Sequence, residues 1–93
     1  MTILVLGALG RHTNLPVNER PETTFTAARP SADHLISATV SVHIAPSGEI
    51  PTFDHFKLPK GVYARVRLMK GETLGFLVGD GEPDGVVSIT EAV

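Results

Sequence analysis

Residues 35–44, LISATVSVHI, carry the clearest structural pattern in the chain. Aliphatic and polar side chains alternate along this stretch. One set contains Ile36, Ala38, Val40, Val42 and Ile44, and the other contains Ser37, Thr39, Ser41 and His43. A period of two places alternate side chains on opposite faces of a β-strand. The stretch therefore predicts a strand with one buried aliphatic face.

The same pattern returns in the C-terminal half. In residues 61–71, GVYARVRLMKG, the predicted inward side chains are Val62, Ala64, Val66 and Leu68, and the outward ones are Tyr63, Arg65 and Arg67. Lys70-Gly71 predicts a tight turn, because glycine accepts the positive φ that such turns require. Residues 74–78 and 86–90 continue the alternation, with Leu74, Phe76 and Val78 on one face and Val87 with Ile89 on another; residues 23–28 are a weaker strand candidate.

These strands predict an all-β protein, with five or six mostly antiparallel strands in a small sandwich or partly open barrel that ends in a C-terminal meander. A chain of 93 residues makes one domain, residues 1–93. We expect residues 1–22 to form either an N-terminal strand, over residues 2–8, or an arm ordered by a partner. Two stretches rich in proline, glycine and polar residues, 11–22 and 45–61, predict long connections of the kind that often contact partners.

Composition excludes several classes of function. The net charge is −2, so a nucleic-acid backbone is not the expected partner. Cysteine is absent, which rules out disulfides and thiolate metal sites. The longest apolar run, Ile3 to Leu9, is far shorter than the ~20 residues of a membrane-spanning helix, so no membrane partner is expected.

The opening ILVLGALGRHTN has Gly7 and Gly10 after an apolar run and in this respect resembles the start of dehydrogenase-like Rossmann proteins. The crossover helix of that fold would have to run through Pro16 and Pro21, and a proline inside a helix costs about 3 kcal/mol. We therefore predict no dinucleotide cofactor.

Residues 80–91, DGEPDGVVSITE, meet the pattern D-x-[DN]-x-[DN]-G-x₅-E at every position except the third, and the stretch resembles an EF-hand calcium loop. The resemblance implies calcium ligands at Asp80, Glu82, Asp84, Ser88 (through water) and Glu91. No helix-forming stretch precedes the loop, and Asp, Gly and Pro are also the usual residues of a connection between strands. A calcium loop and a plain turn therefore both remain open.

No other residues assemble a recognisable catalytic or metal motif. His12, His34, His43 and His55 lack the spacing of zinc ligands, so we expect them on the solvated surface. No G-x-S-x-G is present, and no catalytic residue is predicted.

Charge is distributed unevenly along the C-terminal half. Residues 57–70 carry basic but no acidic side chains, and residues 71–93 carry acidic but no basic ones. The two segments either neutralise each other as a hairpin or make head-to-tail contacts between copies.

Taken together, the extended stretches TTFTAARP (23–30) and PVNERP (16–21) and the C-terminal GVVSITEAV (85–93) resemble small virion accessory proteins of tailed phages, of the head-decoration or cement type. The resemblance implies a structural protein that acts by protein–protein contacts, often as a homo-oligomer.

We therefore predict a non-enzymatic assembly protein whose Ile3, Leu4, Val5 and Leu6 form an interface, located in a virion. The alternative is a small soluble, cytoplasmic binding module whose loop at 80–91 holds calcium.

Overall fold

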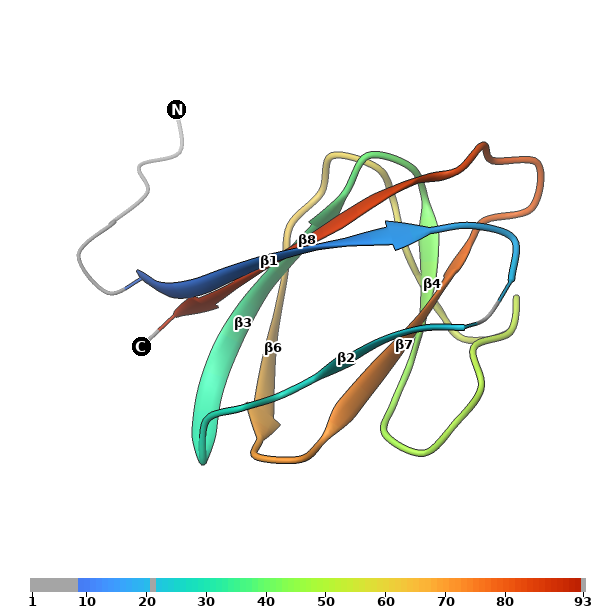
Figure 1. Ribbon diagram of the computed structural model, residues 1–93. Helices are drawn as coiled ribbons and strands as arrows, with labels where there is room; N and C mark the ends of the chain where they lie inside the picture. Colours follow the sequence, from blue (N-terminus) through green and yellow to red (C-terminus); the bar gives the residue numbers. More distant parts are fainter. Residues whose placement is uncertain (1–8, 21, 93) are drawn as a thin grey trace.

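The computed structural model describes residues 9–20 and 22–92, which form eight strands in two four-stranded antiparallel sheets (Figure 1). The strands are β1 (Leu9–Val17), β2 (Thr23–Thr26), β3 (Ser31–Ala38), β4 (Val42–Ala45), β5 (Phe56–Leu58), β6 (Ala64–Met69), β7 (Thr73–Val78) and β8 (Gly85–Ala92). Sheet A has the order β1-β8-β3-β6, and sheet B has the order β2-β7-β4-β5. The predicted all-β class and the antiparallel pairing are confirmed, whereas the strand count is higher than expected. Within the described ranges, no helix is long and apolar enough to cross a membrane.

The chain changes sheet at almost every connection. Only β4 and β5 are both consecutive in sequence and neighbours in one sheet. Strands β1 and β2 contact each other across the two sheets at one edge of the sandwich (Figure 1). Strands β5 and β6 are the edge strands at the other end of the two strand orders. Because consecutive strands lie in different sheets, local sequence patterns predict where the strands are but not which strands pair with each other.

The core lies between the sheets and is made largely by the inward positions that the alternation predicts, together with Val17 and Leu58 from the stretches predicted as connections. Its fully buried aliphatic and aromatic members are Val17, Ile36, Val42, Leu58, Phe76, Val87 and Ile89. Ala64 and Val66 of β6 are half-buried and pack against this core. Val62 does not follow the prediction, because it precedes β6 and is 47% exposed.

Residues 36–44 form two strands rather than one. The break at 39–41 is fixed by Thr39, whose N–H donates to the Val86 carbonyl and whose Oγ1 accepts from the Val86 N–H. Ser41 then accepts a bond from the Gly79 N–H. The chain thus leaves sheet A and enters sheet B. Its alternate residues keep facing the core because the core lies between the two sheets.

Two predicted connections contain strands. Most of 11–22 belongs to β1, which pairs with β8, and Pro16 is tolerated because β1 is an edge strand that needs hydrogen bonds on one side only. The stretch 45–61 contains the short strand β5, which pairs with β4.

The predicted hairpin and meander of the C-terminal half are wrong. The turn itself exists, since the Glu72 N–H donates to the Met69 carbonyl and Gly71 has φ of 88°. The strands on either side nevertheless separate: β6 pairs with β3, whereas β7 pairs with β2 and β4. The basic residues of β6 are therefore not neutralised by the acidic C-terminal segment.

Candidate interaction surface

The outer face of sheet A is covered by polar side chains that bond to one another. His12 Nδ1 lies 2.6 Å from Thr90 Oγ1, and its Nε2 lies 3.0 Å from Asn14 Oδ1. Asn14 Oδ1 also accepts a 2.8 Å bond from Ser88 Oγ. These contacts join the edge strand β1 to β8. Ser88 is thus part of a cross-strand network, as its outward position in a strand predicts.

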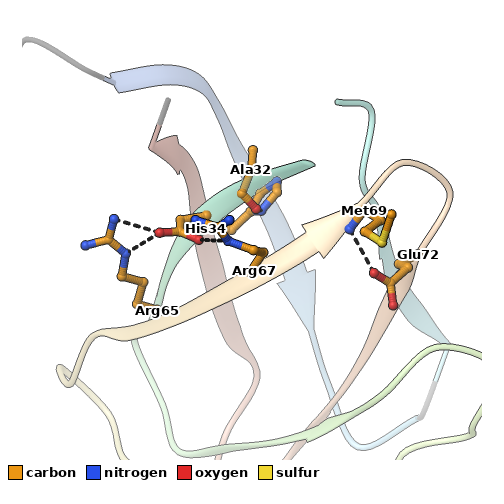
Figure 2. A network of polar contacts seen from close by, with 7 residues as sticks. Ala32, His34, Arg65, Arg67, Met69 and Glu72 are labelled. Carbon is orange, nitrogen blue, oxygen red and sulfur yellow. Dashed lines mark hydrogen bonds and ion pairs between the residues drawn. The ribbon is translucent and has the colours of Figure 1, made fainter. Parts of the chain in front are cut away.

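Asp33 of β3 joins the two arginines of β6 on the same face. Figure 2 labels both arginines, Arg65 and Arg67. Arg65 Nε donates to Asp33 Oδ2 at 2.7 Å, and Arg67 Nε donates to Oδ1 at 2.8 Å. The hydrogen bond from Arg67, followed by that from Arg65, lowers the pKa of Asp33, and Asp33 in turn raises the pKa of Arg67. One carboxylate faces two guanidinium groups, so this end of β6 keeps a net positive charge.

His34 and Glu91 are directly opposite each other on β3 and β8 and are both buried, with 0% and 4% exposure. Glu91 Oε1 accepts bonds from the Arg11 N–H at 2.9 Å and from Arg29 Nε at 3.0 Å. His34 Nδ1 donates to the Ala32 carbonyl, and its Nε2 has no hydrogen-bond partner. The predicted surface position of His34 is therefore wrong, because its place in the alternation turns it inward.

His43 is also buried, at 6% exposure, on the outer face of sheet B beneath the connection 46–55. Its Nδ1–H donates to the His55 carbonyl, and the Phe53 ring packs edge-on against it at 5.4 Å. His55 Nδ1 accepts from the Thr52 N–H, which leaves the ring proton on Nε2, 3.3 Å from Glu49 Oε1. The two histidines hold the connection against the sheet, so His43 also departs from its predicted surface position.

Exposed apolar side chains are concentrated in residues 50–63, which we call the 50–63 segment. The chain has four Phe and one Tyr. Phe25 and Phe76 are in the core, whereas Phe53, Phe56 and Tyr63 are 58%, 62% and 72% exposed. Ile50 is 70% exposed in the same segment. Large apolar side chains in contact with water are typical of an interaction surface where they gather in one patch, and these side chains come from a single segment.

The sequence contains one signal for this surface, and the prediction of a long connection over residues 45–61 did not use it. Three of the five aromatic residues fall within 53–63, and none of the three is at a predicted inward position.

The structure separates the residues of the calcium hypothesis. Asp80, Glu82 and Asp84 lie on the loop between β7 and β8, whereas Glu91 lies six residues beyond the start of β8, or about 20 Å along the strand. Ser88 and Glu91 are engaged with Asn14 and with Arg29. No group of three metal-ligating side chains occurs within the described part of the chain. Calcium binding stays a prediction, and in this conformation the ion would need another ligand in place of Glu91.

Asp84 lines a shallow open hollow of about 260 Å³ together with Asn18, Glu19, Arg20 and Glu22. Its lining is polar and mostly exposed, and it lies where the β1–β2 and β7–β8 loops meet. The predicted interface residues Ile3, Leu4, Val5 and Leu6 lie outside the described residues.

Comparisons with protein families, with curated proteins and with solved structures find no match to this chain. The functional argument therefore depends on the chain's own surface.

Proposed function

We propose that this protein is a non-enzymatic assembly subunit that acts by protein–protein contacts, of the virion accessory type that decorates or cements a capsid. The observation that carries the proposal is the exposure of Ile50, Phe53, Phe56, Val62 and Tyr63 within the 50–63 segment.

Apolar side chains that stay in water do not stabilise a small monomer, whereas covering them with a partner is favourable. Covering a large apolar side chain contributes about 1.5–3 kcal/mol before ordering costs are counted. The connection that carries Phe53 is already held by His43 and His55, so a partner would meet a largely formed surface and would pay less to order it. Lys57 and Lys60 flank the aromatic residues and supply charge for orientation.

Sedimentation velocity of the full chain tests the assembly proposal. We expect a species several times larger than the 9.9 kDa monomer. The double variant Ile50→Ser, Tyr63→Ser should shift the distribution toward monomer while the fold is kept, because both side chains are exposed in the subunit. Val86→Ser, at an exposed position on β8, is the matched control and should assemble like the parent chain. A parent chain that stays monomeric at all concentrations contradicts the proposal.

The virion type requires a second test. The subunit should bind purified capsids at a fixed ratio to the major capsid subunit, and the Ile50→Ser, Tyr63→Ser variant should bind less. Capsids that show no saturable binding would leave an assembly subunit of another kind.

A further inference from the structure

The four sheet edges are not equally protected against pairing with another strand. Edge strand β1 contains Pro16 and a shift of register between Leu9 and His12. The edge strands β2 and β5 have four and three residues. Strand β6 has six residues, pairs with β3 in unbroken register, and contains no proline, glycine or bulge. Proline, bulges, shortness and charged side chains are the usual devices that prevent edge pairing. Strand β6 has only the last of these, Arg65 and Arg67, and is therefore the most accessible edge.

The backbone groups that face this open edge can be identified. The Lys70 N–H donates to the Pro30 carbonyl, toward the β3 side, whereas the Met69 N–H is met by Glu72 Oε1 at 2.8 Å (Figure 2). Backbone groups of alternate residues in a strand point to the same neighbour. Residues 64, 66 and 68 therefore bond toward β3, and Arg65 and Arg67 present their N–H and C=O groups to the open edge.

The side chains near this edge are apolar on the core side. Leu68 is buried, and Val66 and Ala64 are half-buried. Phe56 of β5 pairs with the buried Ile44 of β4 and therefore lies on the core-facing side of sheet B. Phe56 is nevertheless 62% exposed, and Val62 is 47% exposed. The apolar side chains of the edge strands β5 and β6 are thus incompletely covered. A fifth strand on sheet A would cover those of β6.

We propose that residues 2–8 of a second copy of this chain add to the free edge of β6 and extend sheet A. This inference deepens the proposed assembly function and rests on it. The segment has the sequence TILVLGA, and in an added strand Ile3 and Val5 would share one face and Leu4 and Leu6 the other. It carries no charge, so it brings no further positive group to Arg65 and Arg67.

Two geometric arguments select this occupant. If two β6 strands paired across a two-fold axis at Val66, Arg65 of each copy would stand opposite Arg67 of the other, and like charges in that position are destabilising. The chain's own N-terminal segment cannot serve either. It joins β1 at the opposite edge of sheet A, and the new strand position lies four strand spacings away, about 19 Å.

The length of the N-terminal segment can be compared with the distance that it would have to cover to reach β6 of its own chain. Eight residues span at most about 28 Å when fully extended, so only two or three would remain to pair with β6. The added strand must therefore come from another copy. A contact between different surfaces of identical copies is head-to-tail, and it closes into a ring or continues as a filament.

The test uses three full-length variants. Arg67→Pro removes an N–H that faces the open edge without removing a bond to β3, and Arg67→Ala is its control, because it loses the same side chain but keeps the N–H. Leu4→Pro, Val5→Pro disables the added strand and leaves β6 intact. Circular dichroism establishes that each variant folds.

Sedimentation velocity should show the Arg67→Pro variant and the Leu4→Pro, Val5→Pro variant as monomers of 9.9 kDa, and the Arg67→Ala variant as an oligomer. An equimolar mixture of the two monomeric variants should form a 1:1 dimer and nothing larger, because the first still donates residues 2–8 and the second still offers β6. A mixture that stays monomeric while the parent chain assembles overturns strand addition alone. A parent chain that does not assemble overturns the proposed function as well.

Hydrogen exchange provides a second measurement, which reports on the edge amides themselves and needs no mixing of variants. The amides of Arg65 and Arg67 should exchange at least tenfold more slowly in the assembled parent chain than in the monomeric Leu4→Pro, Val5→Pro variant. Equal exchange in the two samples also overturns strand addition.

Discussion

Glu91 is a carboxylate that the fold places almost entirely out of water and still keeps ionised. The bond from the Arg11 N–H, followed by the hydrogen bond and the charge of Arg29, lowers its pKa from the ordinary value of 4.5 against the opposing effect of burial. A carboxylate whose pKa is lower in the folded than in the unfolded chain stabilises the fold above its ordinary pKa. That contribution is lost as the pH falls through the folded value.

We expect Glu91→Gln to lower the free energy of unfolding by about 1–3 kcal/mol at neutral pH, because it removes charge-assisted bonds from a buried site. The difference from the parent chain should shrink in acid, as the parent's own carboxylate is protonated. Urea unfolding at neutral pH and at a series of pH values below about 5 measures this. Asp80→Asn, on the exposed β7–β8 loop, is the control at neutral pH. A difference that stays constant with pH would contradict the role of the charge.

For single residues, the sequence predicted which way the apolar side chains point, but it did not predict that His34 and His43 are buried. Ile36, Val42, Phe76 and Ile89 are inward because a period of two fixes their face. The same alternation places His34 inward, but its predicted surface position came from the missing zinc-ligand spacing and not from this pattern. The buried Glu91 that meets it comes from a strand 57 positions later in the chain, and no local pattern reveals that pair.

At the scale of the element, close packing limits which residues fit where the chain passes from one sheet to the other. A Cβ on Gly85 would lie 2.7 Å from both Thr39 Oγ1 and Val40 Cγ2, where β8 begins beside the β3–β4 break. A Cβ on Gly79 would meet its nearest atom, Glu82 Cγ, at 3.3 Å, and that side chain is flexible.

Gly85→Ala should therefore destabilise the protein by about 1–3 kcal/mol, the usual cost of overpacking, and Gly79→Ala should cost clearly less. Denaturant midpoints of the two variants against the parent chain give the comparison. Equal effects would mean that the crossover at Thr39–Val86 adjusts without strain.

The crossovers also explain why strand pairing escaped prediction. Each alternating stretch specifies a buried face, but a sandwich offers the same core to strands of both sheets. Residues 36–44 keep one inward face while passing from sheet A to sheet B, and nothing in their own pattern distinguishes a straight strand from that passage. The edge at β6 was hidden for the same reason, because it depends on β6 pairing with β3 and not with β7.

For the whole molecule, head-to-tail assembly links stability to protein concentration. A partner that binds only the folded chain stabilises it by about 1.4 kcal/mol for each tenfold rise in concentration above the dissociation constant. For a domain of this size, 1 kcal/mol moves the midpoint of thermal unfolding by about 4–8 °C. The parent chain should therefore unfold several degrees higher after a tenfold rise in concentration.

The Arg67→Pro and Leu4→Pro, Val5→Pro variants should each show a midpoint that does not change with concentration, and their equimolar mixture should regain the dependence. Scanning calorimetry of all four samples over a hundredfold range makes the comparison. Irreversible aggregation would shift the midpoint with scan rate, so each sample is scanned at two rates. A concentration dependence that persists in both single variants would mean that the exposed side chains of the 50–63 segment hold the copies together without strand addition at β6.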